Sequence, residues 1–212
     1  MSGEFHNQPS PKRYGGTQRR IGITGGIASG KSSIGTFLKE IKGLPVLDAD
    51  VYAYEALAPG EASTIAVVER YGNVVKGPSK NQQLTINRSV LGTIIFNNTK
   101  ERCWIEQLIH PVVQMRFQKE LNANKCEPAI ALIIPLLFEA RFTELCSEIW
   151  VVNCTTSQQY KRLKQRDGLT DKEARNRIEA QWPLEKKLQL ADVVIENSGE
   201  LKAWAKEVDK LC

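Results

Sequence analysis

The sequence is poor in metal-binding side chains. It has two histidines, His6 and His110, and five cysteines without a CxxC pair. Protein zinc sites need several such ligands at short spacings, and an odd number of scattered cysteines does not form a disulfide framework. These counts exclude a zinc-binding protein and a disulfide-stapled secreted domain. We interpret the cysteines as reduced structural thiols.

Long apolar runs are also missing. The strongest one, "AIALIIPLLF", is interrupted by Pro135, and no run is long enough to span a bilayer. The first residues, "MSGEFHNQPSPKRYGG", lack the apolar core of a signal peptide. We therefore expect a cytoplasmic protein without a membrane partner, in which residues 1–18 form a disordered tail.

Charge of one sign is not concentrated in blocks. The net charge of +5 comes from 29 basic and 24 acidic residues spread along the chain. This excess suits small phosphorylated ligands without the long basic segments that bind nucleic acid, so no nucleic-acid partner is expected. The length of 212 residues predicts one well-cored domain over residues 19–212, as a monomer or weak oligomer.

Short apolar runs alternate with longer amphipathic ones. Expected strands lie at 20–24, 44–49, 128–135, 148–154 and 192–197, and several carry β-branched residues on consecutive positions. Such runs are typical of parallel strands that are covered on both faces. The alternation predicts an α/β three-layer sandwich with a parallel sheet and right-handed crossovers.

Two stretches fall outside this alternation. Residues 51–126 are too long for one crossover and predict a helical insertion. Residues 156–190 predict a helical lid: one helix begins near Thr156, and a second begins with the capping box Thr170-x-x-Glu173 and is closed by Pro183. A last helix has the apolar face Leu201, Trp204, Val208 and Leu211.

The stretch "GGIASGKSS" follows the first predicted strand and precedes a helix. Residues 25–32 fit G-x-x-x-x-G-K-[ST], the phosphate-binding P-loop, in the strand–loop–helix context that this motif needs. Its backbone N–H groups and the helix N-terminus attract phosphate. Lys31 is expected at the β/γ-phosphates, Ser32 at Mg²⁺ and Ser33 at the α-phosphate. A plain flexible turn would explain the glycines but not Lys31.

Two aspartates, Asp48 and Asp50, end the second predicted strand. Ligands bind at the carboxyl ends of the strands of open α/β sheets. On an extended chain both carboxylates project to the same side, where one could orient an attacking hydroxyl while the other holds the metal or the sugar. The alternative for either aspartate alone is a helix N-cap.

Further candidates follow later strands. Glu139, after "IIPLLF", could hold a water on Mg²⁺ or contact the acceptor, and the alternative is a solvent-facing residue at a helix start. Arg162 and Arg166 share a helix face, and Arg177 and Gln181 are expected to share another. Cations that close over a transferring phosphoryl group stabilise its charge, whereas an ordinary charge run is a solvated face.

Together these motifs resemble those of the dephospho-coenzyme A kinase family. The resemblance covers residues 20–210 and is most specific in the later segments. It rests on "GITGGIASGKSS", "VLDAD", "APG", "NRSVLGTIIFNN", "IEQLIHPVV", "IIPLLFE", "QQYKRLKQRDGLT" and "EARNRIEAQWPLEKKLQLADVVIENSG". It implies that ATP phosphorylates the ribose 3′-hydroxyl of dephospho-coenzyme A, the last step of coenzyme A synthesis.

The resemblance also implies residue roles. Asp50 would be the base for the 3′-hydroxyl, with Asp48 beside it; the other residues belong to three sets. The ATP-binding set is Gly25, Gly26, Ile27, Ala28, Ser29, Gly30, Lys31, Ser32 and Ser33, with Asn197 beside the adenine. The acceptor set is Arg88, His110 and Glu139, and the lid set is Arg162, Arg166 and Arg177.

Three of these positions need comment. Ala28 stands where the family usually has glycine, which is tolerable if its φ stays negative. Tyr54 stands where a basic residue often follows "DAD". A histidine that precedes proline on an amphipathic helix, as His110 does, is more often a structural residue near a helix end than a catalyst.

Two other functions compete with this interpretation. A nucleoside monophosphate kinase phosphorylates a phosphate, which needs no deprotonated hydroxyl, so the two aspartates argue against it. A GTP-dependent switch would carry an NKxD-type guanine motif, and the sequence has none. P-loops occur in all of these classes, so the loop alone does not decide between them.

Overall fold

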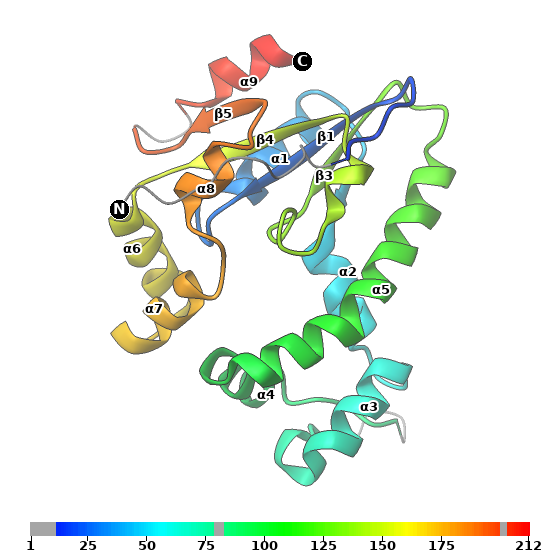
Figure 1. Cartoon of the computed structure of the whole chain (residues 1–212), viewed down its shortest axis with the longest axis vertical. Helices are drawn as coiled ribbons and strands as arrows, with labels where there is room; N and C mark the ends of the chain where they lie inside the picture. The colour runs from blue at the N-terminus through cyan, green and yellow to red at the C-terminus, as the bar shows by residue number, and fades with distance from the viewer. Residues whose placement is uncertain (1–11, 79–82, 200–202) are drawn as a thin grey trace, which may run out of the picture.

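A computed structural model of the chain describes residues 12–78, 83–199 and 203–212. Its centre is a five-stranded parallel sheet in the order β2-β3-β1-β4-β5 (Figure 1). The strands are β1 (Arg19–Gly25), β2 (Val46–Asp48), β3 (Ala129–Ile133), β4 (Glu148–Asn153) and β5 (Val193–Glu196). Each lies within one residue of a predicted strand or inside it, so the predicted parallel α/β fold is confirmed.

Helices cover both faces of the sheet. The described helices are α1 (Lys31–Glu40), α2 (Ala49–Ala56), α3 (Ala62–Tyr71), α4 (Arg88–Asn97), α5 (Thr99–Ala123), α6 (Thr156–Asp167), α7 (Asp171–Glu179), α8 (Leu184–Leu188) and α9 (Ala205–Leu211). Two 3₁₀ turns, η1 (Gly72–Val75) and η2 (Phe142–Leu145), connect them.

Successive residues of the central strands point to opposite faces, as the pleat requires. Trp150 and Val152 belong to a core with α1 and α9, where Phe37 meets Trp204 edge-on with ring centroids 5.6 Å apart. Ile149 and Val151 belong to the other, larger core, which includes residues of α2, α5 and α8. The three predicted layers are therefore two helical layers with the sheet between them.

The predicted helical insertion contains α2 to α5. Its longest helix, α5, has 25 residues and passes over Pro111 without ending, so His110 does not mark a helix end. The buried side chains of α5 recur at every fourth position, which gives one continuous apolar stripe. These are Ile105, Ile109, Val113, Phe117 and Leu121. The insertion packs through this stripe into the same core as the sheet.

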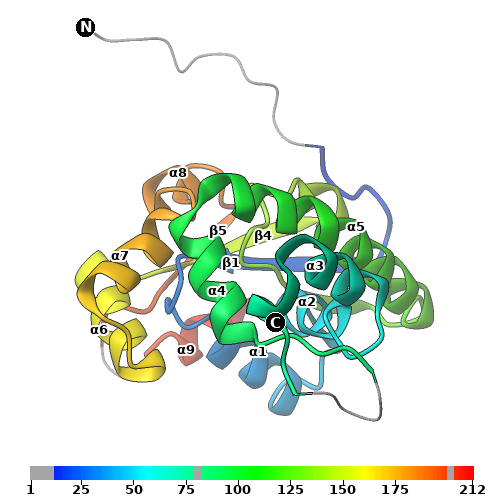
Figure 2. The same ribbon diagram turned by 90° about the horizontal axis from the view of Figure 1, so that it is seen from below.

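The predicted lid contains α6, α7 and α8. Both α6 and α7 begin with complete capping boxes, and the one from Thr170 to Glu173 is the predicted one. The structure corrects one detail, because α7 ends at Glu179 and Gln181 therefore lies beyond the helix that we assigned to it. In Figure 2, α4 of the insertion lies between the lid helices and α3, and it contacts α7.

The described residues near both ends of the chain pack against the body of the protein. Within the predicted tail, residues 12–18 are described: Arg13 pairs with Asp192 at 3.1 Å, and Gln18 donates hydrogen bonds to two backbone carbonyls at 2.8 Å. This part of the tail is therefore anchored to the body. At the other end, Leu201 of the predicted apolar face lies outside the described residues. Among the described helices, none is long and apolar enough to cross a membrane.

Candidate active site

The P-loop connects β1 to α1. Gly25 has φ 146° and Gly30 has φ 106°, backbone conformations that side chains other than glycine rarely adopt. A Cβ on Gly30 would also collide with the side-chain amide of Asn197. Both glycines of the motif are therefore required by the local geometry, and the loop has the strand–loop–helix form that the sequence predicts.

Ala28 differs from its expected conformation. Its φ is 57°, in the left-handed region, so the condition under which alanine would be tolerated without strain, a negative φ, is not met. The loop needs this conformation for its curl, and a Cβ in the left-handed region crowds the following carbonyl oxygen. The loop therefore holds one strained residue, Ala28.

Lys31 lies inside the loop. Its Nζ donates hydrogen bonds to the carbonyl oxygens of Gly26, at 2.8 Å, and Gly25, at 3.4 Å. The residue is 8% exposed, and burial, together with the nearby charge of Lys187, lowers the pKa of Lys31 to about 8. Without a ligand the ammonium is thus held by weak neutral partners, which a phosphate can replace with charged ones.

Two side chains from distant segments support the loop from outside. Gln159 of α6 is buried and donates to the carbonyl of Ile27 at 2.9 Å. The amide of Asn197, after β5, donates to the carbonyl of Ser29 at 2.7 Å. We predicted Asn197 as an ATP-side residue but did not predict Gln159. In the sequence, Gln159 is marked only by being an uncharged polar residue one helical turn before Leu163, in a helix rich in charged residues.

The two aspartates have different environments. Asp48 is the N-cap of α2 and accepts a hydrogen bond from the backbone N–H of Asp50 at 2.8 Å. Burial raises its pKa, although this backbone hydrogen bond opposes the shift. Asp50 lies in the first turn of α2, not on extended chain, which corrects our geometric reason for pairing them. Its side chain is exposed and free of the cap.

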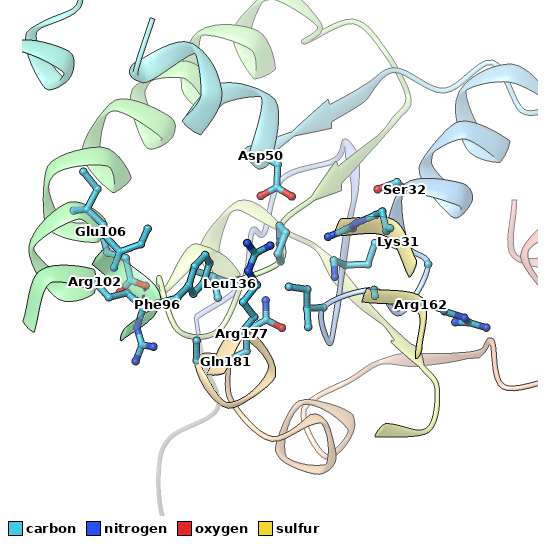
Figure 3. Close-up of a pocket in the computed structure, with 18 of the residues that line it drawn as sticks. Lys31, Ser32, Asp50, Phe96, Arg102, Glu106, Leu136, Arg162, Arg177 and Gln181 are labelled. Atoms are coloured by element: carbon cyan, nitrogen blue, oxygen red, sulfur yellow. Dashed lines mark ion pairs between the residues drawn. The ribbon is translucent and has the colours of Figure 1, made fainter. Parts of the chain in front are cut away.

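A cavity of about 820 Å³ joins these elements (Figure 3). Asp50 and Lys31 point into it from different elements, and Arg177 extends between them from the lid. Seven further residues that we predicted also line it, and residues that we did not predict enter from α4, α5 and α6. The predicted ones are Ile27, Ala28, Gly30, Ser32, Ser33, Arg162 and Arg166, and the polar or aromatic ones that we did not predict include Phe96, Arg102, Glu106 and Gln165.

The lid arginines already have partners. Arg166 pairs with both carboxylate oxygens of Asp167 at 2.7 and 3.0 Å, and Arg177 contacts the same carboxylate at 2.8 Å. These arginines, Arg166 foremost, lower the pKa of Asp167. Arg162 donates to the backbone carbonyl of Asn197 at 2.9 Å and lies toward that edge of the cavity.

The lid also contacts the insertion across the cavity. The guanidinium of Arg177 lies 4.9 Å from the centre of the Phe96 ring, and Asn176 donates to the side chain of Asn97 at 3.0 Å. Phe96 and Asn97 end α4. The predicted lid and the predicted insertion are therefore in direct contact, through α7 and the end of α4, and together they form one wall of the cavity.

None of the three predicted acceptor residues, Arg88, His110 and Glu139, lines this cavity, and Arg88 is the first of them. Arg88 donates two hydrogen bonds of 2.8 Å to the carbonyls of Tyr54 and Leu57, and its guanidinium lies 3.7 Å from the centre of the Tyr54 ring. It thus satisfies the C-terminal carbonyls of α2. Tyr54 occupies the place where a basic residue was expected and supplies a ring for Arg88 to cover.

Glu139 is the second. One of its oxygens, Oε1, accepts hydrogen bonds from Nζ of Lys187, at 2.8 Å, and from the backbone N–H of Trp182, at 2.9 Å. Lys187 is fully buried and also donates to the carbonyl of Pro135 at 2.9 Å. Both partners of Glu139 belong to the base of the lid. Glu139 therefore faces neither solvent, our alternative, nor the large cavity.

A P-loop on a parallel sheet, facing a carboxylate across a cavity with arginines at its edge, defines a P-loop kinase of small molecules. The comparison with known families agrees, because the dephospho-CoA kinase family model matches residues 19–203. The chain belongs to the dephospho-CoA kinase family.

Individual relatives extend over nearly the whole chain. The dephospho-CoA kinase of Prochlorococcus marinus (strain MIT 9313) is 52% identical over 200 residues, which cover 94% of this chain and 98% of that protein. The crystal structure of TT1252 from Thermus thermophilus aligns with a TM-score of 0.74 at 28% identity, covering 92% and 97% of the two chains. The dephospho-CoA kinase from Campylobacter jejuni aligns with a TM-score of 0.63 at 25% identity, covering 91% and 94%.

Proposed function

We propose that the protein transfers the γ-phosphoryl group of ATP to the ribose 3′-hydroxyl of dephospho-coenzyme A, with Asp50 as the base. One observation carries the assignment of residues: Asp50 and Lys31 line the same cavity from different elements, while Asp48 is engaged as a helix cap. The first supplies a carboxylate for a hydroxyl, and the second a cation for the triphosphate.

In the proposed reaction, the 3′-oxygen attacks the γ-phosphorus and a new O–P bond forms. The bond from the γ-phosphorus to the bridging oxygen breaks, ADP leaves, and the hydroxyl proton passes to Asp50. Such transition states spread negative charge over the transferring group, so catalysis consists mainly of positioning and electrostatic stabilisation. The exposed carboxylate of Asp50 is placed to orient the hydroxyl without rearrangement of the helix cap.

Cations from two elements surround the transferring group in this proposal. Lys31 and the loop N–H groups hold the β- and γ-phosphates, and the helix N-terminus adds its partial positive charge. Arg162, Arg166 and Arg177 of the lid close from the other side. A planar guanidinium binds phosphate oxygens with two parallel hydrogen bonds, so each arginine both orients the phosphate and neutralises part of its charge.

The oxygen atoms near the loop suit Mg²⁺. Ser32 opens α1 with an exposed hydroxyl and lines the cavity together with the Asp50 carboxylate. Magnesium is bound by few protein oxygens and keeps waters and phosphate oxygens as its remaining ligands. We propose Ser32 as its protein ligand, where the ion would neutralise charge on the β- and γ-phosphates.

The accessory segments divide the remaining work. We propose that the insertion, residues 51–126, binds the acceptor, and that the lid, residues 156–190, closes over both substrates. The contact of Arg177 with Phe96 supports a lid that reaches the acceptor side. Arg88 and Glu139 contribute indirectly, because they hold the end of α2 and the base of the lid.

Replacement of Asp50 by asparagine tests this function. Asp50→Asn should lower kcat about 10²–10⁴-fold with little change in the KM for ATP, because the lost interaction concerns the acceptor hydroxyl. Asp48→Asn is the matched control, since asparagine caps helices as well as aspartate does and should keep most of the activity.

The assay uses purified wild-type and variant protein with Mg·ATP and either dephospho-coenzyme A or adenosine 5′-monophosphate. Turnover of dephospho-coenzyme A alone is expected. A wild-type enzyme that phosphorylates the monophosphate instead would overturn the proposed function. A larger loss in Asp48→Asn than in Asp50→Asn would show that the two roles are reversed.

A further inference from the structure

A second, smaller hollow adjoins the large cavity at Asp50. It measures about 170 Å³ and lies between α2, α5 and the segment that follows β3. We call it the α2–α5 slot. Its walls are mostly apolar, and two acidic residues, Asp50 of α2 and Glu106 of α5, line both hollows. The apolar wall includes Ala53, Ile109, Val113, Ile134 and Phe142.

Two polar side chains enter this slot from one face of α5. Glu106 and His110 are four positions apart, so they lie one above the other on the helix. The ring of His110 meets that of Phe142 edge-on, with centroids 6.1 Å apart. Burial lowers the pKa of His110, so its imidazole is neutral near pH 7 and can donate one hydrogen bond. Burial raises the pKa of Glu106, whereas Arg102, whose Nε lies 3.9 Å from Oε1 of Glu106, opposes this shift and favours the carboxylate.

The chemistry of the acceptor can be matched to these two hollows. Dephospho-coenzyme A has a ribose that carries the reacting hydroxyl, a base on C1′, and a diphosphate on C5′ that continues into a pantetheine arm. The diphosphate is anionic, and Arg102 and Arg177 line the large cavity. The apolar walls of the slot provide few hydrogen-bond donors for a diphosphate, whereas burial of a flat aromatic ring there is favourable.

Distance along the acceptor points to the same arrangement. If Asp50 binds the 3′-hydroxyl, the ribose lies at the mouth of the slot, and the base is bonded directly to that sugar. The pantetheine arm begins only beyond two phosphates. The volume also fits a ring, since an engineered apolar cavity of about 150 Å³ binds benzene.

We propose that the α2–α5 slot holds the adenine ring of the acceptor, and that Glu106 and His110 recognise its polar edge. This proposal rests on the proposed function, because it places the 3′-hydroxyl at Asp50. The adenine amino group donates hydrogen bonds, which a carboxylate accepts, and the ring nitrogens accept them, which a neutral imidazole can donate. A site built this way disfavours a base with a carbonyl in place of the amino group.

Glu106→Gln tests the recognition of the base. The acceptors are dephospho-coenzyme A and its hypoxanthine analogue, compared by kcat/KM at saturating Mg·ATP. The wild-type enzyme should prefer adenine at least tenfold. The preference should fall severalfold in Glu106→Gln, because the glutamine amide can donate to the hypoxanthine carbonyl. A merely structural role of Glu106 would lower both values together and leave their ratio unchanged, which would count against the assignment.

Ala53→Leu tests the location. A leucine suits a helix and fills the slot, so the KM for dephospho-coenzyme A should rise at least tenfold while the KM for ATP and the melting temperature stay unchanged. Val51→Leu is the matched control, because it enlarges an exposed side chain on the same helix. It should leave both KM values as they are.

Competition separates this proposal from the opposite orientation of the acceptor. Adenosine should compete with dephospho-coenzyme A in the wild-type enzyme at saturating ATP and should lose this competition in Ala53→Leu. If 4′-phosphopantetheine, rather than adenosine, competes in the wild-type enzyme and no longer competes in Ala53→Leu, the slot binds the pantetheine arm and the proposal is wrong. If wild-type protein does not phosphorylate dephospho-coenzyme A at all, the proposed function fails first, which is a distinguishable result.

Discussion

The P-loop and the lid hold their charged groups in opposite ways. Lys31 is buried, donates to carbonyls of its own loop, and is enclosed by supports from α6 and from the segment after β5. Arg166 is exposed and pairs with the neighbouring Asp167. A buried cation with hydrogen-bonded neutral partners is held in one geometry. An exposed ion pair contributes little to stability, so its partners can be replaced at low cost. The loop is therefore formed before ATP binds, and we propose that the lid arginines exchange the Asp167 carboxylate for phosphates when the substrates bind.

The largest expected effect concerns the preformed side of this comparison. Lys31→Ala should lower kcat about 10²–10³-fold and leave the fold intact, because the side chain acts on phosphate charge more than on packing. Steady-state kinetics and circular dichroism measure the two parts. Lys39→Ala, at an exposed position of the same helix, is the control. A folded Lys31→Ala variant with normal turnover would refute the phosphate-binding role of the loop.

The second effect concerns the base of the lid, where Lys187 joins the lid to the segment after β3. Lys187→Met leaves the Glu139 carboxylate buried without its ion pair, and breaking such a pair costs about 3–5 kcal/mol of unfolding free energy. Equilibrium urea unfolding measures this loss. Lys186→Met, at the neighbouring exposed position, should cost far less. Equal losses in both variants would show that the buried pair has no special role.

A double variant sharpens this test. Lys187→Met with Glu139→Leu removes both charges, so much of the lost stability should return, because paired apolar groups can replace a buried ion pair. Such a recovery would confirm that the lysine stabilises through Glu139. If the double variant is less stable than either single variant, packing at this site matters more than the charges.

Sequence patterns predicted the sheet and the loop for identifiable reasons. Buried parallel strands require consecutive apolar residues, and the P-loop spacing is fixed by its phosphate, so both are visible locally. The partners of Lys187 and Gln159 lie far away in the sequence, at Glu139 and Ile27. No local pattern encodes such pairs. Asp48 and Asp50 are a different case, because the N-cap that separates them is local but the residue pattern alone does not show which aspartate caps α2.

The third prediction concerns the lid. Hydrogen exchange in α6 and α7 should slow strongly with a non-hydrolysable ATP analogue and dephospho-coenzyme A together, and only partly with either alone. Helix α8 should change little, because Lys187 ties it to the core. If exchange rates in α6 and α7 are the same with and without both ligands, their arginines are ordinary solvent-exposed residues and do not close over the substrates.

The matching substitution is Arg166→Lys, which keeps the charge but loses the planar fork of donors. Turnover should fall about 10–10²-fold, since one charge-assisted hydrogen bond contributes about 1.5–3 kcal/mol. Steady-state kinetics measure it, with Arg175→Lys, an exposed lid position outside the large cavity, as the control. Equal turnover in wild type and Arg166→Lys would mean that a point charge is sufficient there.

The smallest expected effect is a gain in stability at the strained residue of the P-loop. Ala28 holds φ 57°, and a left-handed conformation costs an alanine roughly 1–2 kcal/mol. Glycine adopts it without this cost, but loses about 0.4–1 kcal/mol through the greater freedom of the unfolded chain. Ala28→Gly should therefore raise the unfolding free energy by up to about 1 kcal/mol, measured by urea denaturation. Ala66→Gly inside α3 should lower it by about 1 kcal/mol, because helical alanine has no strain to relieve. The two changes are chemically identical, so a loss of equal size in both would show that the left-handed conformation of Ala28 carries no strain.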